Sequence, residues 1–345
     1  MGLFSRFSKD IAIDLGTSNT LAYMAHKGIV LNQPSVVVMD KLTQQALAVG
    51  EEAKQMLGRT PGNVASICPR KDGVIADVES AELILKRFMQ QVHGGQNLMA
   101  PRLVVGTPVN TAGVEKRSIR EAAKQSGARE VLTIDEPLAA GIGANLPIDA
   151  PTGSMVVDIG GGTTEAAVLS LYGIVFADSA RVAGNELSEA ILFYLKNVHK
   201  LEVGERTAEE IKIKIGSAYP SKANDEVSME VRGLHTLSGL PRTVMLRGAE
   251  VRESMMEPLS VILEVVKRTL ERMPPELSSD IYERGLMLTG GGALLKGIDQ
   301  LISKDTGLVV HVADDPMNAT ALGMGRGLEQ FAEYSRIFQQ NSDAY

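Results

Sequence analysis

The sequence is poor in residues that mark several common classes of protein. Its 345 residues include one cysteine, Cys68, five histidines and no tryptophan. A single cysteine excludes an intramolecular disulfide, and the absence of CxxC and HExxH spacings leaves no clustered zinc signature. We therefore expect Cys68 to be a small buried or half-buried side chain.

Long apolar runs and an excess of positive charge are also missing. No stretch approaches the roughly 20 apolar residues of a membrane-spanning helix, and the N-terminus lacks the apolar core of a secretory signal. The formal net charge of −7 argues against nucleic acid as a partner, because a phosphate backbone requires a basic face. These absences predict a cytoplasmic protein. Its length suggests about two domains.

Glycine, by contrast, is clustered. The stretch SMVVDIGGGTTEAA, residues 154–167, places three glycines between two apolar runs. The residues after Gly162 are β-branched and aliphatic, with no helix cap or charged face. They therefore predict a β-hairpin, and not the strand-to-helix turn of dinucleotide-binding or P-loop proteins.

A similar stretch, IAIDLGTSNTLAYM, occupies residues 11–24. Aligning Asp14 with Asp158 brings the two glycine turns and their flanking strands into register. One such turn would be weak evidence, but two of them indicate a duplicated lobe with equivalent hairpins.

Both turns have the residue types of a phosphate site. Glycine lets backbone N–H groups approach an anion closely. Short side-chain donors accompany the glycines: Thr17, Ser18, Asn19, Thr163 and Thr164. Asp14 and Asp158 lie just before the turns, where two facing carboxylates could hold a hydrated Mg²⁺ against a polyphosphate. The hairpins therefore predict a cleft between the lobes.

A third glycine cluster lies in GLMLTGGGALLKGIDQLI, residues 285–302. The apolar run 286–288 predicts a strand, and apolar residues follow the glycines at helical spacing: Leu294, Leu295, Ile298, Leu301 and Ile302. A glycine turn there supplies helix N-terminal amides and leaves room for a flat ring. Together the three clusters predict a nucleotide pocket.

The three motifs, in this order, resemble the two phosphate loops and the adenosine loop of the actin, Hsp70 and sugar-kinase superfamily. Over nearly the whole chain the sequence is most similar to the MreB family of bacterial actins, the rod-shape-determining proteins. Further stretches carry this resemblance: GIVLNQPSVV (28–37), AVGEEAKQMLGRTPGN (48–63), DGVIAD (72–77), IDEPLAAGIGANLP (134–147), TAEEIK (207–212) and PPELSSDI (274–281).

The resemblance implies an α/β, actin-like ATPase fold. Two related lobes, with RNase H-like mixed sheets flanked by helices, would surround a nucleotide cleft. Lobe I would span residues 1–150 with a subdomain inserted at about 33–75, and residues 319–345 would return to it. Lobe II would span 151–318, with an insertion at about 186–250.

The resemblance also implies ATP and Mg²⁺ as cofactors, polymerisation on nucleotide binding, and ATP hydrolysis within the filament. Carried over by position, the nucleotide-binding residues are Thr17, Ser18, Asn19, Gly161, Gly162, Thr163, Glu209, Lys212, Gly290, Gly291, Gly292 and Ala293. Glu136, with Thr163, matches the position that orients the attacking water. Asp14 and Asp158 would hold the metal through water.

Some of these residues also have ordinary structural explanations. Glu136 precedes Pro137 and an alanine-rich helix, where a carboxylate commonly caps the helix or lies on the surface. Thr207 and Glu210 fit a capping box. Glu209 and Lys212 therefore acquire a functional role only through the resemblance.

Membrane contact is a further implication. The inner membrane surface would be a partner, together with membrane proteins of the elongation machinery such as RodZ and MreC. Two apolar elements are candidates for lipid contact, namely Leu3, Phe4 and Phe7 at the N-terminus and Leu98 and Met99 in a loop. A frayed terminus and a loop that covers the core are the plainer alternatives.

The protein itself is the remaining expected partner. Val114 lies in a predicted helix over 111–125, with Ile119 and Ala122 or Ala123 facing inward. The resemblance makes Val114 the candidate contact between paired protofilaments.

The expected function is a filament that organises cell-wall synthesis and maintains cell shape. A soluble kinase or chaperone ATPase of the same superfamily stays open as an alternative. So does a bacterial actin paralogue that positions another cargo, because family members commonly have arginine where Cys68 stands.

Overall fold

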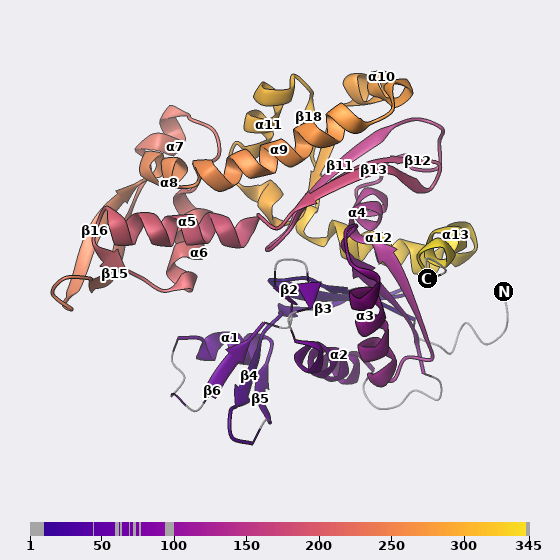
Figure 1. Cartoon of the computed structure of the whole chain (residues 1–345), viewed down its shortest axis with the longest axis horizontal. Coiled ribbons are helices and arrows are strands. Elements are labelled where there is room, and N and C mark those ends of the chain that lie inside the picture. Colours follow the sequence, from indigo (N-terminus) through magenta and orange to yellow (C-terminus); the bar gives the residue numbers. More distant parts are fainter. Residues whose placement is uncertain are drawn as a thin grey trace.

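Two five-stranded mixed sheets organise the chain (Figure 1). The computed structural model describes residues 10–342 except 44, 59–61, 63, 69, 72–73, 76 and 94–99. The proposed lipid-contacting residues Leu3, Phe4, Phe7, Leu98 and Met99 lie outside the described residues.

The two sheets have the same topology. The first has the order β10-β9-β1-β2-β3 and the second β18-β17-β11-β12-β13. In each sheet, the first three strands along the chain pair antiparallel with one another in sequence order. The other two strands of the sheet lie on the far side of the first strand and run parallel to it. The first sheet contains β1 (Ile11–Leu15), β2 (Asn19–Met24), β3 (Gly28–Pro34), β9 (Arg102–Thr107) and β10 (Glu130–Asp135). The second contains β11 (Ser154–Ile159), β12 (Thr164–Ser170), β13 (Gly173–Ala180), β17 (Leu286–Thr289) and β18 (Val310–Val312). The duplication that the two glycine turns predicted is confirmed.

The predicted hairpins are confirmed as well. Leu15 pairs with Thr20 across the first turn, and Ile159 pairs with Thr164 across the second. The two turns are therefore of equal length. Asp14 and Asp158 occupy equivalent positions, each one residue before the residue pair that closes its turn. The apolar flanks form strands because both faces of each sheet are covered by helices.

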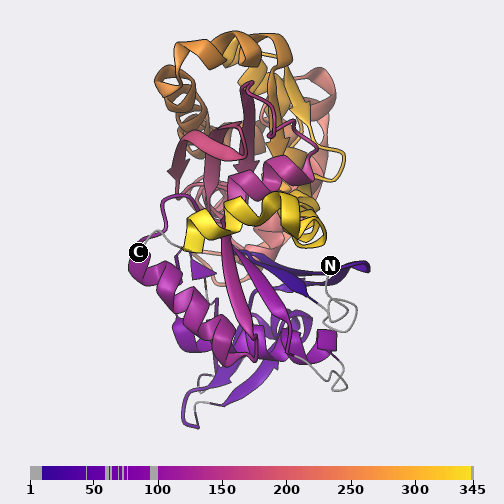
Figure 2. The same cartoon turned by 90° about the vertical axis from the view of Figure 1, so that its right-hand side faces the viewer.

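Two helices, α4 (Glu136–Gly143) and α12 (Ala319–Glu329), lie between the sheets (Figures 1 and 2). A Cβ placed on Gly143 would lie 1.8 Å from the Ala319 carbonyl oxygen, and one on Gly323 would lie 1.8 Å from that of Ala139. The two backbones therefore touch at positions that only glycine allows. Val104 of the first sheet and Val156 of the second belong to the same buried cluster, so one core joins the sheets.

The outer faces are covered by separate groups of helices. On the first sheet these are α2 (Val78–His93) and α3 (Gly113–Gln125), and on the second α5 (Gly184–Asn197), α9 (Met256–Arg272), α10 (Pro275–Arg284) and α11 (Ile298–Thr306). The last helix, α13 (Phe331–Ser342), packs on β10. In α3, Ile119, Ala122 and Ala123 are buried as predicted, whereas Val114 is 78% exposed.

Smaller units extend from both sheets. One contains β4 (Val37–Asp40), β5 (Ala46–Val49), β6 (Val64–Ile67) and α1 (Glu51–Met56), and is followed by the two-stranded pair β7 (Arg70–Lys71) and β8 (Val74–Ile75). The other contains β14 (Leu201–Glu202), β15 (Ser228–His235), β16 (Pro241–Arg247), α6 (Glu205–Ile215), α7 (Lys222–Glu226) and α8 (Gly248–Ser254).

Two local predictions are wrong. Cys68 is exposed, because it follows β6, which is an edge strand of its sheet. After the third glycine cluster the chain first forms a 3₁₀ helix, η2 (Gly291–Leu294), and α11 begins only at Ile298. In the described part of the chain, every helix is too short or too polar to cross a membrane.

Candidate functional site

The turns of the two hairpins touch each other. A Cβ placed on Gly161 would lie 2.1 Å from Ser18 Oγ and 3.3 Å from the Ser18 backbone nitrogen. The two turns belong to different sheets, and each is rich in short side chains that can donate hydrogen bonds. They approach this closely because position 161 has no side chain. Thr17, Asn19 and Thr163 are half-buried beside this contact.

The first turn is held by a serine that the sequence did not single out. Ser35 is buried, and its Oγ donates to the Gly16 carbonyl at 2.6 Å. Its backbone N–H donates to the Ser18 carbonyl at 3.0 Å, and its Oγ lies 2.8 Å from Thr20 Oγ1. These bonds fix the shape of residues 16–18.

The second turn is held by the start of α5. Gly184 N–H donates to the Gly160 carbonyl at 3.2 Å, and Asn185 N–H donates to the Gly161 carbonyl at 2.7 Å. Both contacts are made by the backbone, so they do not depend on the side chain at position 185.

Helix α6 places Glu209 and Lys212 at the second turn. Lys212 Nζ lies 2.6 Å from the Gly184 carbonyl, which accepts its hydrogen bond, and 2.6 Å from Glu209 Oε2. Ser188 Oγ donates to the same Glu209 oxygen at 2.7 Å. A lysine ammonium held here places positive charge beside the glycines of the turn.

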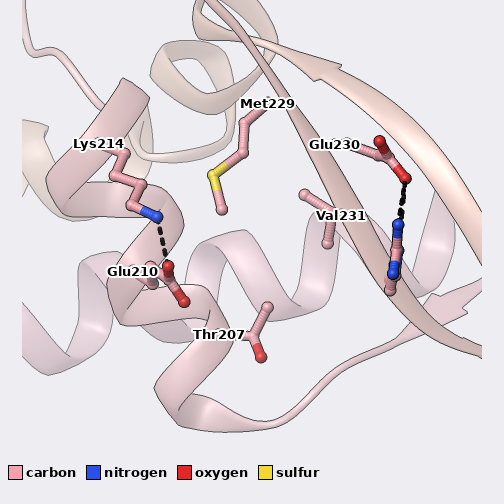
Figure 3. A pocket seen from close by; sticks show the side chains of 7 residues that line it. Thr207, Glu210, Lys214, Met229, Glu230 and Val231 are labelled. Carbon is pink, nitrogen blue, oxygen red and sulfur yellow. Dashed lines mark hydrogen bonds and ion pairs between the residues drawn. The ribbon is translucent and has the colours of Figure 1, made fainter.

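The predicted capping box in this helix is wrong. Helix α6 begins at Glu205, after Gly204, so Thr207 already lies inside its first turn. Glu210 pairs instead with Lys214, one turn further along (Figure 3). This ion pair borders a shallow surface hollow between α6 and β15, apart from the glycine turns.

The third glycine cluster packs against the second hairpin. A Cβ on Gly290 would lie 2.3 Å from the Ile159 carbonyl oxygen and 2.9 Å from Asp158 Oδ1, and one on Gly292 would lie 2.2 Å from Ile159 Cγ2. A Cβ placed on Gly291 would meet no described atom within 4 Å beyond its chain neighbours, and Ala293 is buried. Packing therefore requires glycine at positions 290 and 292, whereas at Gly291 there is open space beside the backbone.

Glu136 lies buried near the turns. It is 6% exposed, and its Oε1 lies 2.8 Å from Nη1 of Arg70, which is 4% exposed. The same Nη1 donates to the Leu15 carbonyl at 2.6 Å. The alternative of a surface carboxylate is therefore wrong, and Arg70 is a site residue that sequence reasoning missed.

The carboxyl groups around Glu136 are perturbed by burial and by one another. Burial, with the negative charge of Glu136, raises the pKa of Asp14 to about 8. Burial raises the pKa of Asp158 to about 6, although a 2.8 Å hydrogen bond from Thr289 Oγ1 opposes the shift. Ionisation of these carboxyl groups is therefore costly unless a positive charge lies close to them.

Glu165 is a further buried carboxyl group that the sequence analysis did not use. It is 1% exposed, and burial, with the charge of Glu136, raises its pKa well above the usual value. Its Oε1 accepts a 2.8 Å hydrogen bond from Val109 N–H of the other sheet, and its Oε2 is buried without a partner. Glu165 lies among apolar residues directly after the second turn, and this position was the signal in the sequence that could have identified it.

These features fit a polyphosphate with its cation. The turns provide glycine backbone and short donors, Lys212 provides positive charge, and the carboxyl groups could hold metal-bound water. In the described residues, no three side chains of His, Cys, Asp or Glu are grouped to ligate one metal ion directly.

Replacing Gly161 with alanine should weaken nucleotide binding about tenfold or more, because Ser18 must move and overpacking costs about 1–3 kcal/mol. Titration with a fluorescent ATP analogue measures the effect. Gly204→Ala is the matched control, because nothing lies within 4 Å of a Cβ there. Equal affinity in both variants would contradict the contact between the turns.

The carboxyl cluster should make the stability of the ligand-free protein depend on pH. Asp14 keeps its proton up to pH 8 or so when folded, whereas in the unfolded chain it loses it near pH 4. The free energy of unfolding should therefore fall as the pH rises through this window.

Thermal melts at pH 6, 7 and 8 measure this dependence, and a magnesium-bound nucleotide should flatten it because the cation stabilises the ionised groups. Asp14→Asn should also give a shallower slope. A slope identical to that of the wild type in this variant would contradict the assignment.

Comparison with known proteins identifies the family. The family model described as MreB/Mbl protein matches residues 8–336. The cell shape-determining protein MreB of Escherichia coli K12 is 52% identical over 329 residues, 94% of each chain. The cell shape-determining protein Mbl of Bacillus subtilis 168 is 49% identical over 319 residues, 92% of this chain and 95% of that protein.

Solved structures agree with this match. MreB5 of Spiroplasma citri bound to ADP superposes with a TM-score of 0.90 at 33% identity, covering 96% of this chain and 98% of that chain. The MamK double helical filament gives a TM-score of 0.77 over 93% of this chain and 99% of that chain, and at 22% identity it shows the fold alone. The fold is therefore actin-like and two-lobed, and the chain belongs to the MreB/Mbl family.

Proposed function

We propose that this chain is an ATP-dependent bacterial actin that forms filaments at the inner membrane surface, organises cell-wall synthesis and maintains cell shape. The contact of Gly161 with Ser18 carries the proposal, because it unites equivalent turns of the two lobes at one site. Relatives named as cell shape-determining proteins, and MreB5 bound to ADP and to AMPPNP, support it.

The proposed nucleotide site draws on three loops. Phosphates are bound by the turns at 16–19 and 160–163, with Lys212 beside them, and the base lies against Gly291 and Ala293. Mg²⁺, when bound, neutralises phosphate charge, and Asp14 and Asp158 hold it through water. A ligand that contacts both turns fixes the relative position of the lobes. Filament assembly can then depend on whether the nucleotide is bound.

Hydrolysis requires positioning more than covalent catalysis. In the proposed reaction, Glu136 accepts a hydrogen bond from the attacking water and Thr163 helps to orient it. The buried position of Glu136 suits this role, because a fixed carboxylate in a dry environment directs a water molecule better than a mobile one.

The remaining proposed contacts are between protofilaments, with lipid and with membrane proteins. Val114, exposed on α3, pairs protofilaments. Leu3, Phe4 and Phe7, together with Leu98 and Met99, contact lipid. The membrane proteins RodZ and MreC connect the filament to wall synthesis.

Glu136→Gln should separate assembly from hydrolysis. The amide keeps the size of the side chain but loses the charge, so phosphate release should fall about 10-fold or more while filaments still form with ATP. Phosphate release and sedimentation measure the two properties. Glu271→Gln, at an exposed position of α9, is the control, and phosphate release at the wild-type rate from Glu136→Gln would contradict the role.

Negative-stain electron microscopy with Mg-ATP on a lipid monolayer tests the filament. Paired filaments lying on lipid are expected, and Val114→Glu should give single filaments because it places charge in the pairing contact. Val198→Glu, at another exposed valine, should leave pairing intact. Discrete particles from a protein that binds ATP would favour a kinase or chaperone ATPase instead.

A further inference from the structure

Arg70 occupies an unusual position for an arginine. In the described part of the chain it is buried more completely than any other arginine or lysine, at 4% exposure. It belongs to β7, which follows the unit formed by β4, β5, β6 and α1. Its guanidinium reaches from β7 to the residue before the first glycine turn and to Glu136.

One nitrogen of this guanidinium serves two acceptors. Nη1 donates at 2.6 Å to the carbonyl of Leu15, the residue before the first glycine turn, and at 2.8 Å to Glu136 Oε1. The turn and the carboxylate are thereby held by a single group. A displacement of Arg70 would disturb both.

The charge of Arg70 is balanced by several carboxyl groups. Glu136, Asp14 and Glu165 all act on it electrostatically, and the ion pair with Glu136 is the closest. A buried carboxylate whose cation is removed is strongly disfavoured and must find another arrangement. Without Arg70, the charge of Glu136 would lie among the carboxyl groups of Asp14, Asp158 and Glu165.

We propose that Arg70 is a positioning residue for ATP hydrolysis, which fixes the Glu136 carboxylate relative to the first phosphate turn. This proposal rests on the role proposed above for Glu136. In this proposal Arg70 acts through that carboxylate.

The connection gives strand β7 a route to the reaction. Arg70 Nη1 binds the Leu15 carbonyl as well as Glu136 Oε1, so a shift of β7 would change the position of the water-orienting carboxylate relative to the first turn. Because Ser35 also holds the first turn, such a shift should change the rate of hydrolysis more than the affinity for ATP.

The test compares kcat and KM for ATP in Arg70→Met, Arg70→Lys, Glu136→Gln and the double variant Arg70→Met/Glu136→Gln. Arg70→Met should lower kcat by about 10-fold to 100-fold, the range expected for a misplaced catalytic group. Its KM should stay near that of the wild type. Arg70→Lys should recover part of kcat, since an ammonium retains the charge but not the planar geometry.

The double variant distinguishes action through Glu136 from an independent role. If Arg70 only positions Glu136, the double variant should be no slower than Glu136→Gln alone. Arg102→Met is the control, because Arg102 forms a 2.8 Å ion pair with Glu130 on the same sheet, away from the turns. Melting temperature and AMPPNP affinity show whether each variant is folded.

The outcomes separate the two proposals. Wild-type kcat in Glu136→Gln would overturn the role of Glu136 and, with it, this inference. A low kcat in Glu136→Gln with a wild-type kcat in Arg70→Met would overturn the inference alone. So would a double variant in which the two losses of kcat multiply. A rise in the KM of Arg70→Met as large as the fall in its kcat would also overturn it. Should Arg70→Met fail to fold, Arg70→Lys decides by the same comparison, because it retains the buried charge.

Discussion

The structure depends on the close approach of two glycine turns that belong to different sheets. Gly161 has no side chain, and Ser18 occupies the space that one would fill. This contact is possible because α4 and α12 hold the sheets together through equally close backbone contacts at Gly143 and Gly323. Glycines thus allow two close contacts, one between the helices that join the lobes and one between the two glycine turns. A ligand between the turns is then in contact with both halves of the molecule.

A second constraint is the burial of charge at this junction. Asp14, Glu136, Asp158 and Glu165 lie within electrostatic reach of one another, with Arg70 among them. Such a cluster is costly in the absence of a ligand, since burial disfavours ionised carboxyl groups. A polyphosphate with its cation, bound as proposed above, would offset the repulsion between these groups. The proposed function therefore implies that the ligand-free protein is less stable than the bound form.

The sequence was informative where a short stretch determines its own structure. Alternating apolar residues around a glycine turn predicted both hairpins, and the spacing of Asp14 and Asp158 revealed the duplication. It failed where partners come from distant segments. Ser35, Arg70 and Glu165 acquire their roles only when the chain folds, because their respective partners, the Gly16 carbonyl, Glu136 and Val109, are remote from them in sequence. The capping box at Thr207 failed for a local reason: Gly204 allows the helix to begin earlier, and Lys214 competes for Glu210.

The proposed function requires that one nucleotide is held jointly by the turns of the two lobes. A structure of the protein with Mg-AMPPNP would show where the nucleotide lies. We expect the phosphates between the backbone amides at Ser18 and Gly161, the cation within one water of Asp14 and Asp158, and the base against Gly291. Phosphates bound by one turn alone, or a nucleotide bound away from both turns, would contradict it.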